Sequence, residues 1–307
     1  MNSSPGKNQF YTGIALAIAA TLIWSGNFIV ARGVNGKILP VSLAYYRWLT
    51  AALVMAPFAF NAFKKEIHAI AKSWKYLILI SLTGIAFFNT FIYIAGRYVP
   101  AINLALIATT SSPVMSAVLA AIFLKEKMSW LSITGLLICI CGIVLLLSKG
   151  SWDTLMNFRF TKGDWWTLLA ALMFAVYNIL AKRKPTGISP PAFLFTIFAL
   201  GTLMLLPAFA WQVTHAPAPA WNSNLVWVIL YLGIGASVIA YLCWNAAIKR
   251  LGAARTALFG NLIPIFSTLE AVMILKEDIK PIHIASGLLV ISGLIIANLQ
   301  KKNTVPR

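Results

Sequence analysis

Residues 261–277, NLIPIFSTLEAVMILKE, form an apolar stretch with Pro264 near its start and a Lys-Glu pair at its end. Residues 110–126, TSSPVMSAVLAAIFLKE, repeat this pattern, and in both copies the closing glutamate follows the proline by 13 positions (277 − 264 and 126 − 113). The two copies are 151 positions apart (264 − 113). Other residues match at that offset without a gap, namely Ala20 and Ala171, Asn27 and Asn178, Arg32 and Arg183, Pro40 and Pro191, Gly84 and Gly235, and Gly142 and Gly293. The chain is therefore an internal duplication, and the duplication decides its architecture.

The composition is that of a membrane protein. The 307 residues are 60% hydrophobic and 10% charged, with a mean hydropathy of +0.83, and so little polar surface cannot cover a water-soluble globule. The net charge of +18 would suggest a nucleic-acid partner if it formed one basic face, but the basic residues stand in short clusters between apolar runs. That distribution is typical of membrane topology, so we expect a lipid bilayer as partner and no nucleic acid.

Ten apolar runs are long enough for a helix that crosses the hydrocarbon core, which takes roughly 20 residues. They cover residues 11–31, 40–60, 74–95, 98–122, 130–148, 163–182, 190–211, 224–247, 252–275 and 281–299. Because each half has an odd number of spans, the second half must enter the membrane from the opposite side. We therefore predict an all-α polytopic membrane protein whose ten transmembrane helices form two inverted five-helix repeats. The predicted parts are a first repeat at 1–148, a connecting loop at 149–162, a second repeat at 163–300 and a short basic tail at 301–307.

The basic residues predict the orientation in the membrane. If the N-terminus is cytoplasmic, the inner connections hold 15 of the 25 lysines and arginines and the outer connections hold 8, with Arg47 and Arg255 inside helices. Cytoplasmic loops carry the excess of basic residues in membrane proteins. We therefore predict a protein of the cytoplasmic membrane with both termini in the cytoplasm.

Polar and aromatic residues within the predicted spans indicate a substrate cavity, since a polar group in hydrocarbon needs an internal partner or a wet space. On the eighth span Ser237, Tyr241 and Asn245 recur at spacing four, which places them in one stripe on a helix. Hydrogen bonding between helices explains any single residue equally well, and only their concentration favours a shared cavity. The candidate substrate-binding residues are Trp24, Asn27, Asn89, Tyr93, Thr109, Ser112, Tyr177, Asn178, Ser237, Tyr241, Trp244 and Asn245.

Two charged residues lie deep within predicted spans. Arg47 follows Pro40 by seven positions, about 10 Å along a helix, which is too deep to reach water unaided. Glu270 lies six positions from both Pro264 and Lys276, about 9 Å from each. An ionised acid at the bilayer centre would cost about 2.5–3.5 kcal/mol, so Glu270 should be protonated, paired or in contact with water. Two roles for Glu270 stay open: proton coupling, and a structural contact to a polar side chain.

Pro113 and Pro264 are candidate hinges. Each removes a backbone hydrogen bond from its helix, and breaks at corresponding positions of two inverted halves point to the moving parts of a transporter. A tolerated kink is the plain alternative. The first half has Leu119 at the position of Glu270, so the carboxylate is not part of what the two halves share.

The cysteines and histidines do not indicate a metal or an active site. Cys139, Cys141 and Cys243 lie inside apolar runs, and His68, His215 and His283 lie far apart near run ends. This spacing suits neither a metal site nor a Ser-His-Asp arrangement. An intramembrane enzyme would need paired acids or clustered His and Cys, so we expect no enzyme activity, no metal and no cofactor.

These features together resemble the drug/metabolite transporter superfamily, and within it the EamA-type ten-helix transporters. The resemblance covers nearly the whole chain. It rests on the doubled pattern Pro113…FLKEK…Gly135…Gly142 and Pro264…ILKED…Gly287…Gly293, on WSGNFIVARG at residues 24–33, and on YYRW around Arg47. Members usually have glycine before the glutamate, where this chain has Lys125 and Lys276. We expect that change to alter loop electrostatics more than transport.

The resemblance implies ten helices, cytoplasmic termini, a central cavity and alternating access, commonly for export of amino acids, other metabolites or drugs. Many members are thought to be proton-coupled. We accordingly predict a secondary active transporter that exports a small metabolite such as an amino acid or a related compound, with protons as the coupling partner to be tested. Uncoupled transport or uptake of a metabolite or drug-like molecule is the alternative within transport, and a membrane protein that only binds partners is the alternative outside it. The oligomeric state stays open.

Overall fold

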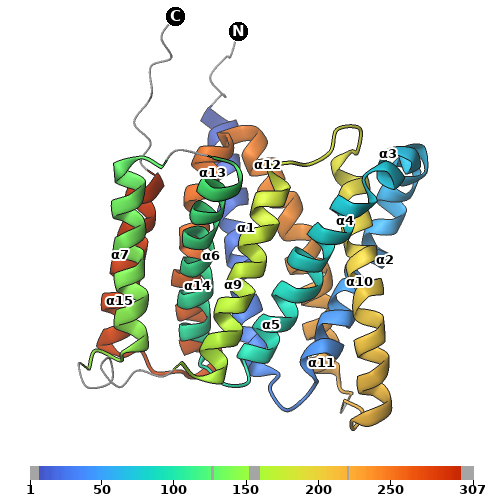
Figure 1. The fold of residues 1–307 in the computed structure, drawn as a ribbon. Helices are drawn as coiled ribbons and strands as arrows, with labels where there is room; N and C mark the ends of the chain where they lie inside the picture. The colour runs from blue at the N-terminus through green and yellow to red at the C-terminus, as the bar shows by residue number, and fades with distance from the viewer. Residues whose placement is uncertain (1–6, 126–127, 152–159, 220, 299–307) are drawn as a thin grey trace, which may run out of the picture.

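The part of the chain that the structure describes is built of helices joined by turns and loops (Figure 1). The computed structural model describes residues 7–125, 128–151, 160–219 and 221–298. The predicted tail at 301–307, most of the predicted connecting loop at 149–162, and Glu126 of the doubled pattern lie outside these ranges.

The helices follow one another in two series. The first half runs through α1 (Lys7–Gly33), α2 (Pro40–Lys65), α3 (Ile67–Lys72), α4 (Trp74–Ser81), η1 (Leu82–Phe87), α5 (Phe88–Ala95), α6 (Ala101–Phe123) and α7 (Trp130–Leu147). The second half runs through α9 (Lys162–Ala181), α10 (Pro190–His215), α11 (Ser223–Leu230), η2 (Tyr231–Ile239), α12 (Ala240–Leu251), α13 (Ala253–Phe259), η3 (Gly260–Leu262), α14 (Ile263–Glu270), η4 (Ala271–Leu275) and α15 (Pro281–Asn298). The segments η1, η2 and η4 have the wider π-helical winding, and η3 is a 3-10 turn.

Eight helical stretches among the described residues are long and apolar enough to cross a membrane. They are Asn8–Gly33, Pro40–Lys65, Trp74–Ala95, Ala101–Phe123, Trp130–Leu147, Lys162–Ala181, Pro190–His215 and Ser223–Leu251. The last two predicted spans contain shorter apolar helices, Gly260–Leu275 and Pro281–Ala297. The structure thus gives membrane-crossing length to eight of the ten predicted spans, and the count of ten stays a prediction.

The ninth predicted span is not a single regular helix. The chain passes there from α13 through the 3-10 turn η3 into α14 and then into η4. Pro264 stands in the first turn of α14, where its missing N–H removes no helical hydrogen bond. Pro113, by contrast, lies inside the uninterrupted helix α6. The two predicted hinge residues therefore differ, since the winding changes just before Pro264 and does not change at Pro113.

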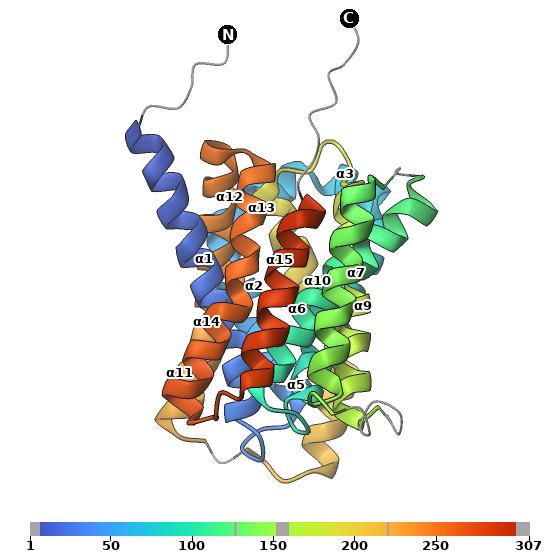
Figure 2. The ribbon, with the colours of Figure 1, turned by 90° about the vertical axis from the view of Figure 1, so that its left-hand side faces the viewer.

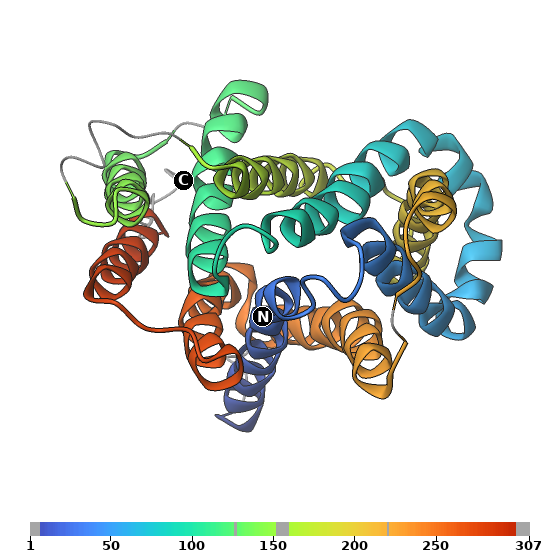
Figure 3. The same cartoon turned by 90° about the horizontal axis from the view of Figure 1, so that it is seen from below.

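Helices from the two halves of the chain lie side by side. α2 packs against α10, α7 against α15, α1 against α12 and α14, and α9 against α5 and α6. Seen along the bundle, α7 and α15 lie at one end and α2, α3 and α10 at the other (Figure 3). Figure 2 shows the adjacent helices α7 and α15 in front. α1 begins and α15 ends on the same side of the bundle (Figure 1).

The contact between α7 and α15 depends on small residues. A β-carbon added at Gly135 would lie 2.5 Å from the carbonyl oxygen of Gly293, and one added at Gly293 would lie 2.6 Å from that of Gly135. The buried thiol of Cys139 donates to the carbonyl of Val290 at 3.5 Å. Small residues allow helix backbones to approach closely inside a membrane, where apolar side chains gain little by leaving lipid.

The Lys-Glu pair at the end of the doubled pattern has a structural role in its second copy. The Glu277 carboxylate accepts hydrogen bonds from the backbone N–H groups of Ala101 at 2.8 Å and Ile102 at 3.1 Å, at the start of α6. Lys276 before it adopts a left-handed backbone with φ of +57°, and Lys125 has φ of +54°. Glycine adopts this conformation without strain. The two lysines therefore have a conformational consequence, beyond the electrostatic one expected from the sequence.

Candidate functional site

Arg47 on α2 is the centre of a buried hydrogen-bond network, the arginine network. Its Nη1, which has two N–H groups to donate, lies within hydrogen-bond distance of three acceptors: Oδ1 of Asn27 at 2.6 Å, Oδ1 of Asn89 at 2.8 Å and the hydroxyl of Tyr93 at 2.8 Å. Its Nε donates to the hydroxyl of Ser237 at 2.9 Å. None of these five residues exposes more than 6% of its surface. The structure thus brings four predicted substrate-binding residues together around the arginine that the sequence placed deep in the membrane.

The arginine network holds a cation with neutral partners. The guanidinium lies 4.7 Å from the centre of the Trp48 ring, and the hydroxyl of Tyr93 donates in turn to Oδ1 of Asn27 at 3.0 Å. Hydrogen bonds to a charged group contribute about 1.5–3 kcal/mol each, more than neutral ones do. Because the partners come from α1, α5 and η2, Arg47 fixes helices of the first half to η2 of the second half.

Glu270 ends α14 and contacts α1. The hydroxyl of Ser25 lies 2.8 Å from Oε1 of Glu270 and 2.6 Å from the carbonyl oxygen of Leu22. A hydroxyl has one proton to donate, so Ser25 donates to one of these two acceptors at a time. When it donates to Leu22, a protonated Glu270 can donate to the Ser25 oxygen. Oε2 of Glu270 is buried and has no hydrogen-bond partner among the described residues. The carboxyl group therefore has a contact suited to both of its protonation states.

The segment of α1 at residues 23–27 contacts both charged residues and η2. The hydroxyl of Tyr231 donates to the carbonyl of Ile23, and the indole N–H of Trp24 donates to a carbonyl of η2 at 3.0 Å. Gly26 makes room for this approach, because a β-carbon there would lie 2.2 Å from the hydroxyl of Tyr231. A shift of this α1 segment would therefore disturb the contacts of the carboxyl group and of the arginine network together.

A second group of predicted residues is more accessible than the arginine network. Trp24 packs against Tyr241 and Trp244 with ring centroids 5.4 and 5.2 Å apart. Tyr177 from α9 lies near Tyr241. Asn245 is exposed, and its amide donates to the carbonyl of Tyr241 at 2.9 Å. We call these five residues the aromatic wall, and its four rings are half-buried.

The remaining predicted residues lie on α6 and α9. The hydroxyl of Thr109 donates to a carbonyl of its own helix at 2.7 Å. Ser112 is buried, and its hydroxyl has no partner among the described residues. The amide of Asn178 donates to the hydroxyl of Ser116 at 3.4 Å, which links α9 to α6. These residues join neither the arginine network nor the aromatic wall.

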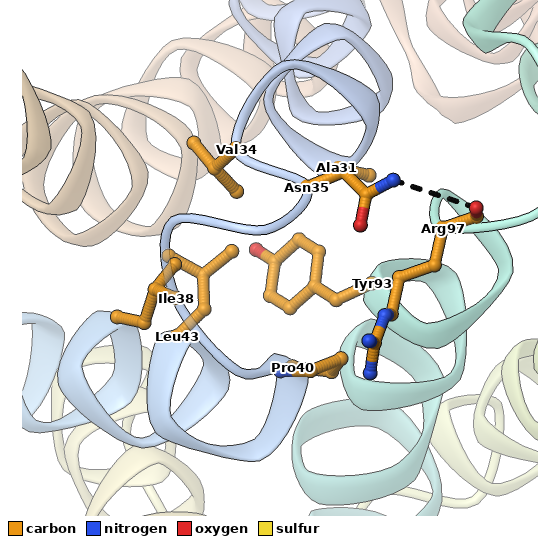
Figure 4. A pocket seen from close by; sticks show the side chains of 8 residues that line it. All are labelled: Ala31, Val34, Asn35, Ile38, Pro40, Leu43, Tyr93 and Arg97. Carbon is orange, nitrogen blue, oxygen red and sulfur yellow. Dashed lines mark hydrogen bonds between the residues drawn. The ribbon is translucent and has the colours of Figure 1, made fainter. Parts of the chain in front are cut away.

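The arginine network is closed toward the side of the bundle where α1 ends. The pocket there measures about 10 Å³ and lies against Tyr93 (Figure 4), enough for about one water molecule. The amide of Asn35 donates to the carbonyl of Arg97 at 3.5 Å beside it. A β-carbon at Gly96 would lie 2.4 Å from the carbonyl oxygen of Ala31, so the ends of α1 and α5 touch. This pocket is too small for a metabolite.

Ser25 and Tyr231, which make hydrogen bonds at the site, were not among the residues predicted from the sequence. Ser25 stands between two predicted residues in WSGN, and that neighbourhood is the signal that could have indicated it. Tyr231 has no such signal, because its hydrogen bond depends on Gly26 and on a carbonyl 208 positions away in the chain.

Apolar membrane-crossing helices that enclose a guanidinium and a carboxyl group define an integral membrane protein with a polar interior. The model of the EamA-like transporter family matches residues 11–148 and again residues 161–299. The chain belongs to this family, and it is a transporter rather than an enzyme.

Relatives of this chain are named as transporters, and their matches cover more than nine tenths of both chains. The chain is 27% identical to an uncharacterized transporter of Archaeoglobus fulgidus, over 94% of this chain and 98% of the relative. It is 26% identical to the uncharacterized transporter YyaM of Bacillus subtilis, over 92% of each chain. It is 27% identical to a probable terminal-alkyne amino-acid exporter of Streptantibioticus cattleyicolor, also over 92% of each chain. A solved crystal structure shares the fold with a TM-score of 0.64 at 18% identity, over 94% of this chain and 96% of the other.

Proposed function

We propose that this transporter exports a small metabolite, such as an amino acid or a related compound, across the cytoplasmic membrane by alternating access coupled to protons. The observation that carries the proposal is the carboxyl group of Glu270. It lies in the span region without a cationic partner among the described residues, with one buried oxygen unbonded and the other on Ser25. Such an acid is suited to take up and release a proton.

Alternating access requires two halves that can move against each other, and the duplication supplies them. Two matches of one family model, at 11–148 and 161–299, support two repeats. The π-helical segments support them too, because η1 with Gly84 and η2 with Gly235 lie at matching positions of the 151-residue offset. The contact between Cys139 and Val290 joins residues related by the same offset. We infer ten spans in two inverted five-helix repeats, with Pro113 and Pro264 at corresponding positions.

The aromatic wall is the surface we assign to the substrate. Its half-buried rings and exposed Asn245 offer an apolar face and a polar group to a small molecule, as ligand sites commonly do. The buried arginine network lies on the closed side and serves to hold the helices. The relative from S. cattleyicolor is named for the export of an amino acid, which supports the substrate class and the direction. Cytoplasmic termini follow from the basic residues.

A metabolite comparison tests the export directly. Cells without the protein, with it, and with Trp244→Ala are compared by mass spectrometry of the medium and of cell extracts. We expect at least one small metabolite to rise in the medium of cells with the protein and to fall back with Trp244→Ala. The matched control is Trp130→Ala at the start of α7, which is 79% exposed. Accumulation inside the cells would indicate uptake, and equal profiles would contradict transport of a metabolite present in these cells.

A further inference from the structure

A groove of about 400 Å³ opens on the flank of the bundle between α2, α3, α4 and α10. The helices that line it lie at the end of the molecule opposite α7 and α15, where α3 leads from α2 to α4 (Figures 1 and 3). Its walls include Phe60 and Phe63 of α2, Trp74 of α4, and Phe195 and Leu203 of α10. The volume lies within the range of about 300–1,000 Å³ that ligand sites have.

The walls of this groove offer no unsatisfied polar group to a ligand. All lining residues are apolar except Thr196, whose hydroxyl donates to the carbonyl of Ala192 at 2.7 Å within α10. A polar solute would lose its water here and gain no hydrogen bond. The groove therefore suits a hydrocarbon chain, and on the flank of a membrane protein the chains at hand are those of phospholipids.

Two lysine side chains stand at the rim of the groove. The ammonium group of Lys64 lies 4.6 Å from the centre of the Phe60 ring, and that of Lys75 lies 5.5 Å from the Trp74 ring, and both rings line the groove. Both lysines are exposed, at the last turn of α2 and the first turn of α4. Tryptophan and lysine at the ends of spans lie at the depth of lipid headgroups. Neither ammonium group is paired with a carboxylate among the described residues.

We propose that this groove binds an acyl chain of one anionic phospholipid, whose headgroup is held by Lys64 and Lys75. The apolar walls hold the chain but do not select the lipid, because the bilayer interior is as apolar as the groove. Selection comes from charge. A lysine near an anionic membrane surface contributes about a fivefold preference, so two lysines give a preference on the order of 25-fold over a zwitterionic lipid.

Native mass spectrometry of the full-length protein in detergent tests the site. The protein is titrated with equal amounts of phosphatidylglycerol and phosphatidylcholine that carry the same acyl chains. We expect one phosphatidylglycerol to bind with a preference of about 25-fold. Lys64→Gln combined with Lys75→Gln brings the preference to within about twofold of parity. Ala199→Trp fills the groove, leaves both lysines in place, and lowers the bound phosphatidylglycerol severalfold.

The controls separate a site from a general attraction between a basic protein and an anionic lipid. Lys37→Gln combined with Lys280→Gln removes the same charge at exposed positions outside the groove, and should leave the preference unchanged. Thermal melting checks that each variant is folded. If Ala199→Trp does not fold, Leu203→Trp in the same wall of the groove takes its place. An equal loss in both lysine pairs overturns the proposal. Undiminished lipid binding in the filled groove overturns it as well.

Discussion

Ser25 and Glu270, 245 positions apart in the chain, are joined by a 2.8 Å hydrogen bond between α1 and α14. Oε2 of Glu270 has no partner among the described residues, so Ser25 holds the carboxyl group by one oxygen only. The hydroxyl of Ser25 can donate to a carboxylate or accept from a carboxylic acid. It is therefore the residue expected to support Glu270 in both protonation states.

Ser25→Ala should lower proton-driven transport by about tenfold or more, because a hydrogen bond to a charged group contributes about 1.5–3 kcal/mol. Ser25→Thr keeps the hydroxyl and should retain most of the rate. The measurement is the initial flux of the exported metabolite into or out of liposomes at several pH values. Ser81→Ala is the matched control, since Ser81 is a fully buried serine whose hydroxyl has no partner among the described residues. A Ser25→Ala protein with the flux and pH profile of the wild type would contradict the role of this bond.

Arg47→Leu should destabilise the protein by roughly 3 kcal/mol or more, because it removes the charged donor from the buried oxygens of Asn27 and Asn89. The free energy of unfolding in mixed detergent measures the loss. Arg47→Lys should recover only part of it, since an ammonium group cannot reproduce the fork of the guanidinium. Arg255→Leu at an exposed position on α13 is the control and should change stability little. Equal effects of the two leucine substitutions would show that the network adds no stability.

Glu277→Ala should cost about 1 kcal/mol, the usual loss when a helix N-terminus loses the side chain that accepts its N–H groups. The backbone N–H groups of Ala101 and Ile102 lose their acceptor in this variant. Thermal melting in detergent measures the change against Asp278→Ala, an exposed acid next in the chain. If both alanine variants melt alike, Glu277 does not stabilise α6.

Lys276→Gly should stabilise the protein by about 1 kcal/mol, because glycine adopts the left-handed backbone of this position without a β-carbon clash. Lys276→Ala removes the same charge and keeps the strain, so it should bring no gain. The two variants separate the backbone effect from the loop electrostatics that the sequence suggested. Equal melting temperatures for Lys276→Gly and Lys276→Ala would indicate that the lost charge, and not the backbone conformation, determines the change in stability. Lys280→Gly, where φ is not positive, controls for the glycine itself.

From the sequence we predicted that two charged residues lie deep within spans and that polar residues lie near them, and the structure buries Arg47 and half-buries Glu270. Helical rise alone placed Arg47 and Glu270 inside the membrane, and spacing four placed Ser237 and Tyr241 on one face. The same residues then fell into two sets, Ser237 in the arginine network and Tyr241 in the aromatic wall. Spacing along one helix does not tell how that helix is rotated against its neighbours, and the rotation decides which contact each residue makes.

The duplication predicted the matching of the halves but not the winding within them. Gly84 and Gly235 matched by offset, yet nothing in the apolar runs indicated that both lie in π-helical segments. The ninth span reads as one apolar run, and its change of winding before Pro264 depends on packing around α13 and α14. The glycine that the family usually has at the position of Lys276 was the one local signal of a left-handed backbone there.

The most direct test of proton coupling at Glu270 is transport of the exported metabolite in liposomes with and without an imposed pH gradient. The wild-type flux should respond to the gradient, and Glu270→Gln, which cannot exchange a proton, should show a flux that the gradient does not change. Glu277→Gln should keep the response, because the Glu277 side chain lies outside the site and contacts the backbone N–H groups at the start of α6. Full dependence on the gradient in Glu270→Gln, or a wild-type flux that ignores the gradient, would contradict proton coupling through this carboxyl group.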